Sequence, residues 1–108
     1  MIEEAAKYVY SLLLELKYKD LEEFTGSKRL TADEIKYCIE DYGYHLVQYP
    51  DEIKLDVIKV TGSNPTEWSV IAPVYTVEEG LSDLSIELSV IDNGEKIFRV
   101  ELDNIRVR

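Results

Sequence analysis

The sequence predicts one α+β domain, with N-terminal helices packed on one face of a four-stranded antiparallel meander sheet. Apolar residues recur at helical spacing through about residues 2–43, whereas they alternate in the manner of strands through about residues 53–107. A chain of 108 residues is long enough to bury one core of its own. We therefore expect residues 1–108 to form a single domain with a helical half and a sheet half.

The first two predicted helices come from apolar spacing and from end signals. Seven residues with helical spacing predict a first helix whose buried face runs to Leu16: Ile2, Ala5, Ala6, Val9, Leu12, Leu13 and Leu16. A short helical turn follows, for which Asp20 is the expected N-cap and Glu23 lies three residues later. Gly26 is the expected stop.

The third predicted helix covers about residues 32–42 and has the strongest signals. Thr31 and Glu34 have the spacing of a capping box, and Gly43 suits the left-handed residue that ends a helix. Leu30 is placed to pack on the first buried side chain. The predicted buried stripe consists of Ile35, Cys38, Ile39 and Tyr42.

Four strands are predicted at about residues 53–61, 67–76, 81–91 and 95–103. In the first, the alternation changes parity near Val57, which indicates either a bulge or burial on both faces. In the second, Pro73 requires an edge position or a bulge because it has no N–H group. The expected inward residues of the second strand are Trp68, Val70, Ala72 and Val74.

The last two strands are expected to form a hairpin, because even-numbered apolar residues continue on both arms. The inward sets are Leu84, Ile86, Leu88 and Val90 on the first arm, and Phe98, Val100 and Leu102 on the second. A three-residue loop over 92–94, with Gly94 left-handed, opposes Leu88 to Phe98 and keeps both sets on one face.

The same register gives two outer pairs and a kinked tail. It places Glu87 opposite Arg99 and Asp83 opposite Asp103. Because Ile105 and Val107 have odd numbers, the tail to Val107 would continue the strand only after a kink near residues 103–104.

Charge and composition exclude several classes of function. With 12 basic and 22 acidic residues the formal charge is −10, and no cluster of Lys and Arg is present, so we expect no nucleic-acid ligand. A basic protein partner is electrostatically reasonable, although high acidity also keeps a small protein soluble. The N-terminus has neither a signal peptide nor a membrane span, so we expect a cytoplasmic protein.

The segment "EEGLSDL" at 78–84 raises the question of a metal or catalytic site. Glu78, Glu79 and Asp83 surround a glycine at the start of a strand, and Asp103 could add a fourth carboxylate. Calcium needs six to eight oxygens from a tightly spaced loop, and these acids lack that spacing. We therefore expect a solvated turn and no cofactor, and we assign no metal-binding or catalytic residue.

Cys38 and His45 form the one possible thiol–imidazole pair, since the chain has one cysteine and one histidine. Cys38 lies in a predicted buried stripe, whereas a reactive thiol needs an exposed, electropositive site. The single cysteine also excludes an intramolecular disulfide. Eight tyrosines, including Tyr42, Tyr44 and Tyr49, suit packing in the core and at its rim more than an interface.

Asp56 is the acid whose face the pattern leaves open. If Asp56 shares the face of Ile58 and Val60, it points into the core beneath the helices. A buried carboxylate there could act as a proton-abstracting base, as in ketosteroid-isomerase-like proteins. A bulge would turn it outward instead.

Two stretches, "RLTADEIKYCIEDYGYHL" and "EWSVIAPVYTVEEGLSDLSIELSV", resemble a family of small bacterial stand-alone domains of unknown function. The shared pattern comprises Arg29-Leu30-Thr31, Tyr42-Gly43, Pro50, Trp68, Glu78-Glu79-Gly80 and Ser82-Asp83-Leu84. Leu81 stands where members tend to have Arg, which weakens the idea of a shared charged site. The resemblance implies one domain and no assigned activity. The element order is also similar to cystatin-like and nuclear-transport-factor-2-like architectures.

Three hypotheses of function follow. We favour a non-catalytic protein-interaction module, an acidic binder of a basic protein such as an immunity protein for a toxin. The alternative is a small-molecule or enzymatic pocket between helices and sheet, near Asp56. The third is a component of an oligomer, because the sequence leaves the oligomeric state open.

Overall fold

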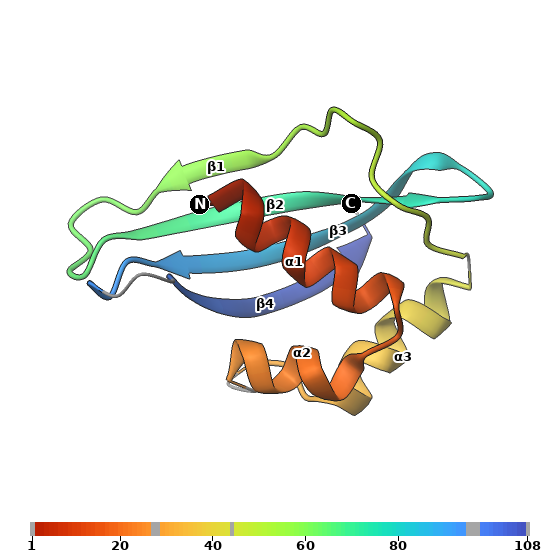
Figure 1. Ribbon diagram of the computed structural model, residues 1–108, viewed down its shortest axis with the longest axis horizontal. Helices are drawn as coiled ribbons and strands as arrows, with labels where there is room; N and C mark the ends of the chain where they lie inside the picture. The colour runs from red at the N-terminus through yellow and green to blue at the C-terminus, as the bar shows by residue number, and fades with distance from the viewer. Residues whose placement is uncertain (1, 27–28, 44, 95–97, 108) are drawn as a thin grey trace.

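The computed structural model describes residues 2–26, 29–43, 45–94 and 98–107, and within them three helices precede four strands (Figure 1). The helices are α1 (Ile2–Leu14), α2 (Tyr18–Thr25) and α3 (Ala32–Tyr42). The strands are β1 (Asp56–Lys59), β2 (Glu67–Thr76), β3 (Gly80–Ile91) and β4 (Arg99–Val107). They form one antiparallel sheet in the order β1-β2-β3-β4, so the predicted α+β meander is confirmed.

The helices cover one part of the sheet and leave another bare. Helix α1 crosses β2 and β3, and α2 and α3 contact β4 (Figure 1). The core lies between these layers and includes Val9 and Leu13 of α1, Ile35 of α3, and Ile86 and Leu88 of β3. None of the helices in the described ranges is long and apolar enough to cross a membrane.

Helix α3 forms as its local signals predict. The Thr31 hydroxyl accepts a hydrogen bond from the Glu34 N–H at 3.3 Å, and the Glu34 carboxylate accepts one from the Thr31 N–H at 3.1 Å. Gly43 ends the helix with a φ of +83°, a conformation that glycine adopts without steric cost. Ile35 and Ile39 are buried, whereas Cys38 and Tyr42 are half-buried.

The end of α1 differs from the prediction at Leu16. The helix ends at Leu14, and the Leu16 and Lys17 N–H groups donate back to Leu13 (3.1 Å) and Leu12 (2.8 Å). This is a Schellman motif with Leu16 in its left-handed position, at φ +59°. Leu16 is 66% exposed, so the prediction that its side chain lies on the buried face is wrong. A left-handed residue with a Cβ costs about 1–2 kcal/mol.

Helix α2 begins earlier than predicted. Tyr18 is its first residue and Lys17 occupies the N-cap position, so the assignment of Asp20 as N-cap is wrong. The Schellman turn of α1 passes directly into α2, which fixes the start of α2 without a side-chain cap. Gly26 ends α2 at φ +78°, as predicted.

Strand β1 is shorter and more exposed than predicted. It covers Asp56–Lys59 instead of 53–61, and all four of its residues are exposed. Its pairing with β2 continues without a register shift, so neither a bulge near Val57 nor burial on both faces explains the sequence pattern. The reason is its place at the sheet edge, beyond the strands that α1 crosses (Figure 1).

Strands β2 and β3 have the predicted faces. Val70, Ala72 and Val74 are fully buried, and Trp68 at the same parity packs against the core. The pairing of β2 with β3 shifts between Pro73 and Tyr75, so Pro73 lies at an irregularity as its missing N–H requires. The four predicted inward residues of β3 are also buried.

The predicted register of β3 with β4 is wrong, although the predicted faces are right. Leu88 pairs with Leu102 and Val90 with Val100, so the register differs by four residues from the one that opposes Leu88 to Phe98. An even shift keeps every side chain on its face. The connection is therefore longer than a three-residue loop, although Gly94 is left-handed as predicted, at φ +84°. Residues 95–97, where the predicted strand begins, lie outside the described residues.

A register shift in β4 accounts for the change of parity at its end. Leu88 pairs with Leu102 and Glu87 with Asn104, so Asp103 is an extra residue. Ile105 then faces inward opposite Ile86 and is buried, which confirms the predicted switch.

In the observed register neither predicted outer pair forms, that is, neither Glu87 with Arg99 nor Asp83 with Asp103. The Glu87 carboxylate binds Arg106 at 2.6 Å, and Arg99 binds Glu101 at 2.9 Å. Asp103 does not oppose Asp83. Instead its carboxylate accepts a hydrogen bond from the Ser89 hydroxyl at 2.6 Å.

Candidate functional site

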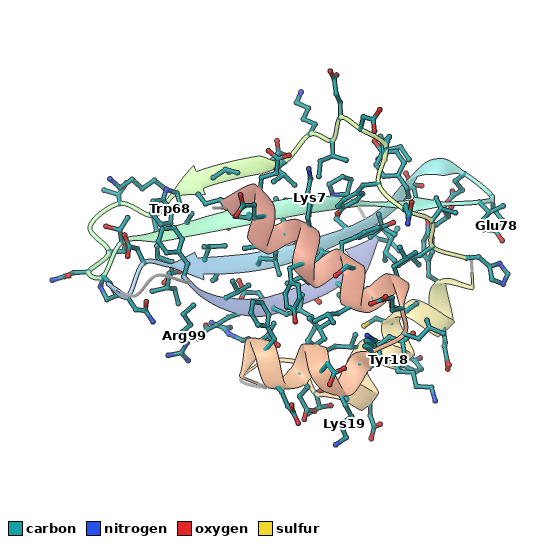
Figure 2. All side chains as sticks on the ribbon, in the orientation of Figure 1. Lys7, Tyr18, Lys19, Trp68, Glu78 and Arg99 are labelled. Carbon is teal, nitrogen blue, oxygen red and sulfur yellow. The ribbon has the colours of Figure 1, made fainter. Side chains whose placement is uncertain are left out.

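The acidic turn between β2 and β3 contacts the segment that follows α3. One oxygen of Glu78 accepts a hydrogen bond from the His45 N–H at 2.9 Å, and its other oxygen lies 2.8 Å from His45 Nδ1. Both contacts lower the pKa of the Glu78 carboxyl, and the contact with the His45 imidazole has the larger effect. Figure 2 shows Glu78 at the tip of this hairpin, at one end of the molecule.

The same turn contacts the last residue of α3. The Tyr42 hydroxyl donates to the Glu79 carboxylate and accepts from the Asp83 N–H at 3.3 Å. The prediction of a solvated turn is right about exposure, since Glu78, Glu79 and Asp83 are exposed, but it misses these contacts. Within the described ranges no group of three or more His, Cys, Asp or Glu residues is placed to hold a metal ion.

Residues 45–47 pair with the end of β2 beyond the point where β1 stops. The Val77 N–H donates to the His45 carbonyl, and the Val47 N–H donates to the Tyr75 carbonyl, each at 2.9 Å. Leu46 forms a bridge with Thr76 between them. This short segment therefore satisfies backbone groups of β2 that β1 does not reach.

Three tyrosines fix this end of the β2 edge. The Tyr10 hydroxyl of α1 donates to the Val47 carbonyl and accepts from the Tyr75 N–H at 3.2 Å. The Tyr49 hydroxyl donates to the Pro73 carbonyl at 2.6 Å, and its ring stacks on that of Tyr10. Burial raises the pKa of both phenols, Tyr10 and Tyr49. These tyrosines serve packing, as the sequence favours.

Asp56 and Cys38 lack the surroundings that catalysis would need. Asp56 is exposed and pairs with Ile71, at the parity opposite to buried Val70, so it points away from the helices and the core. The alternative in which it faces the core is therefore wrong. Burial, together with the charges of Glu34 and Asp41, raises the pKa of the Cys38 thiol, which favours the unreactive protonated form.

The outer face of α3 carries an exposed tyrosine among carboxylates. Tyr37 is 69% exposed, and the residues three and four positions before and after it are all acidic and exposed. We call this set the α3 acidic face: Asp33, Glu34, Tyr37, Glu40 and Asp41. The capping-box pattern predicts a role for Glu34 at the helix start, and this face was not predicted, although the helical spacing of the five residues contains it.

A groove lies beside this face, between the end of α1 and α3. Its volume is about 720 Å³, and we call it the α1–α3 groove. The apolar part of its lining consists of Leu14, Leu16, Tyr18, Ile39 and Leu46. Lys36, Glu40 and His45 also line it, and Glu40 belongs to the α3 acidic face as well.

Comparison with known proteins identifies a family without an assigned activity. Residues 10–108 match the family described as "Domain of unknown function (DUF7668)", and the chain belongs to that family. Neither the curated proteins nor the solved structures contain a match to the chain.

Proposed function

We propose that this member of the family DUF7668 is a non-catalytic protein-interaction module whose α3 acidic face binds a basic segment of a partner protein. The proposal depends on the exposure of Tyr37: the residue is 69% exposed and lies at the centre of four carboxylates. Tyrosine is enriched in protein interfaces, where it provides a large contact area with few rotatable bonds.

The chemistry of the face suits lysine and arginine. A cation over the Tyr37 ring gains about 0.5–1 kcal/mol at an exposed site. The carboxylates of Asp33 and Asp41 add charge-assisted hydrogen bonds, whereas Glu34 caps the helix and Glu40 lies 4.0 Å from Lys36. The chain's formal charge of −10 would also steer a basic partner toward it and raise the association rate at low salt.

The end of α3 carries charges that oppose its own stability. Glu40 and Asp41 lie in the last turn, which has no basic residue, so both face the negative end of the helix dipole. Each such charge costs about 0.3–1 kcal/mol. An arrangement that weakens the free helix is expected where the charges act on a partner.

The partner class we propose is a basic protein met in the cytoplasm. An immunity protein that neutralises a basic toxin is the more specific form of this proposal. It is supported by the small size of the domain, its acidity and an acidic face on a rigid, doubly capped helix.

The test places a photo-crosslinking amino acid at position 37 and, as a matched control, at position 58 in the native host. Ile58 is 64% exposed on β1, far along the chain from α3. We expect position 37 alone to capture a discrete partner whose contacting segment is basic. Equal capture at both positions, or a partner with an acidic contact segment, would contradict the proposal.

A charge-reversal variant sharpens this test with the purified partner. Glu40→Lys combined with Asp41→Lys should weaken binding at least tenfold, because two attractive charges become repulsive. Reversal of Asp51 and Glu52, which are exposed in the segment before β1, is the control with the same change in net charge. If both double variants weaken binding equally, net charge accounts for the affinity and the α3 acidic face does not.

A further inference from the structure

The α1–α3 groove has a strained, exposed leucine at its rim. Leu16 has a φ of +59° in a turn where glycine would be free of strain, and the residue is 66% exposed. The side chain therefore costs the free protein stability and adds little to its own core. Strain of this kind is often stored at binding sites, so an observed outlier justifies a hypothesis of function.

The charges at the groove favour a neutral occupant. Lys36 has the Glu40 carboxylate 4.0 Å away, and His45 has Glu78 at 2.8 Å. Beside Leu16, Lys17 has Glu15 at 3.5 Å. Each basic side chain that the structure describes at this rim thus has an acidic partner within 4 Å, and the rest of the described lining is largely apolar. A charged ligand would displace these pairs, whereas an aliphatic side chain would lie between them.

The groove and the α3 acidic face share an edge. Glu40 lines the groove and belongs to the face, and Lys36 of the groove directly precedes Tyr37 in the helix. A partner that places cations on Tyr37 and its carboxylates therefore carries neighbouring residues over the groove. The four carboxylates of the α3 acidic face favour a basic partner segment.

We infer that the α1–α3 groove takes an aliphatic side chain of the same basic segment, with Leu16 as the principal contact. This inference rests on the proposed function and adds a second element to the recognised segment, a leucine-like residue among lysines or arginines. The charges mainly set the association rate of the partner, and the apolar contact mainly sets its dissociation rate.

The probes are two synthetic lysine-rich peptides of equal length and charge, one with two central leucines and the other with two central serines. Titration of isotope-labelled protein, followed by NMR, gives the affinity and the position of each. We expect the leucine peptide to bind about tenfold more tightly. Its additional shifts should appear at the methyl groups of Leu14, Leu16, Ile39 and Leu46.

Variants at Leu16 separate binding from folding. Leu16→Gly and Leu16→Asn both suit the left-handed turn, so each should keep or raise the melting temperature. Each should also remove the preference for leucine over serine and leave the affinity for the serine peptide unchanged. Leu81→Ser is the matched control, because Leu81 is 62% exposed on β3 and does not line the groove.

The outcomes distinguish the inference from the proposed function. Equal affinity for both peptides, including no binding of either, or a leucine preference that survives Leu16→Gly, would overturn the inference. Serine-peptide binding that Glu40→Lys with Asp41→Lys abolishes, without any leucine preference, would leave the proposed function standing alone. An affinity for the leucine peptide that this charge reversal leaves unchanged would overturn the proposed function and keep the groove.

Discussion

The two ends of the β2 edge have the same kind of backbone pairing and very different surroundings. Near its start, β2 pairs with β1, whose four residues are all exposed. Near its end, β2 pairs with residues 45–47, and α1 holds that pairing through the Tyr10 hydroxyl. Both ends form backbone hydrogen bonds, and the second is also joined to helix α1 by the hydrogen bonds of the Tyr10 hydroxyl.

The difference shows that strand pairing alone does not place a strand in the core. A hydrogen bond contributes only about 0.5–1.5 kcal/mol net, because water competes for both groups. Burial of a large apolar side chain contributes about 1.5–3 kcal/mol, and it requires a covering layer. Strand β1 has apolar residues such as Val57 and Ile58 and remains exposed because it lies beyond the strands that α1 crosses.

The largest change in unfolding free energy is expected on β3, which the helices cover, and it is compared with a change on the exposed strand β1. Leu88→Ala on β3 should lower the free energy of unfolding by about 3 kcal/mol, since Leu88 is 1% exposed and its loss leaves a cavity. Ile58→Ala on β1 should change it by less than about 0.5 kcal/mol. Urea unfolding followed by circular dichroism measures both. Equal losses would mean that β1 is covered in solution.

An intermediate effect is expected at the tyrosines that hold the second end of the edge. Tyr10→Phe and Tyr49→Phe should each cost about 1–2 kcal/mol, because each leaves a backbone carbonyl without its hydroxyl partner. Tyr37→Phe on the exposed face of α3 is the control and should be neutral. If all three variants unfold alike, these hydroxyl contacts contribute nothing to stability.

Alkaline pH probes the same two tyrosines. Because burial raises the pKa of Tyr10 and Tyr49 in the folded protein, their contribution is fully present below the unfolded value of about 10. It is lost as the pH rises further, since the unfolded chain releases these protons more readily. The unfolding free energy of Tyr49→Phe should therefore fall less than that of the wild type between about pH 9 and 11.

The smallest effect is expected at the acidic turn, outside the core. The pKa of Glu78 is lowered, so its contribution is present above the ordinary Glu value and is lost as the pH falls through the folded value. Glu78→Gln should reduce the slope of stability against pH in the acid range, by a small amount that added salt diminishes. Glu4→Gln, exposed on α1, is the control. A slope identical to the wild type would show that the His45 contact is without effect.

Local chemistry made much of the fold predictable. The capping box at Thr31 and the left-handed Gly43 define α3 from residues within one turn of each end. The alternation in β2 and β3 identifies their inward faces because a strand has a period of two. Of the candidate site, the five residues of the α3 acidic face follow from helical spacing once α3 is known, although this face was not among the predictions.

Other features required contacts between distant residues. A shift of four residues keeps the same faces of β3 and β4, so alternation could not choose between registers, and the burial of Ile105 opposite Ile86 decided it. Helical spacing placed Leu16 inside because it carries no information on where the chain must turn into α2. The Tyr42–Glu79 contact joins residues 37 positions apart.

The helix ends at Thr31, Gly26 and Gly43, the inward faces of β2 and β3 and the acidity of the surface thus follow from the sequence, because they depend on neighbours along the chain. Tertiary structure alone decided the register of β4, the exposure of β1, the outward direction of Asp56 and the groove beside Leu16. Each of these depends on which distant side chains compete for the limited area beneath the helices, and that competition has no local signal.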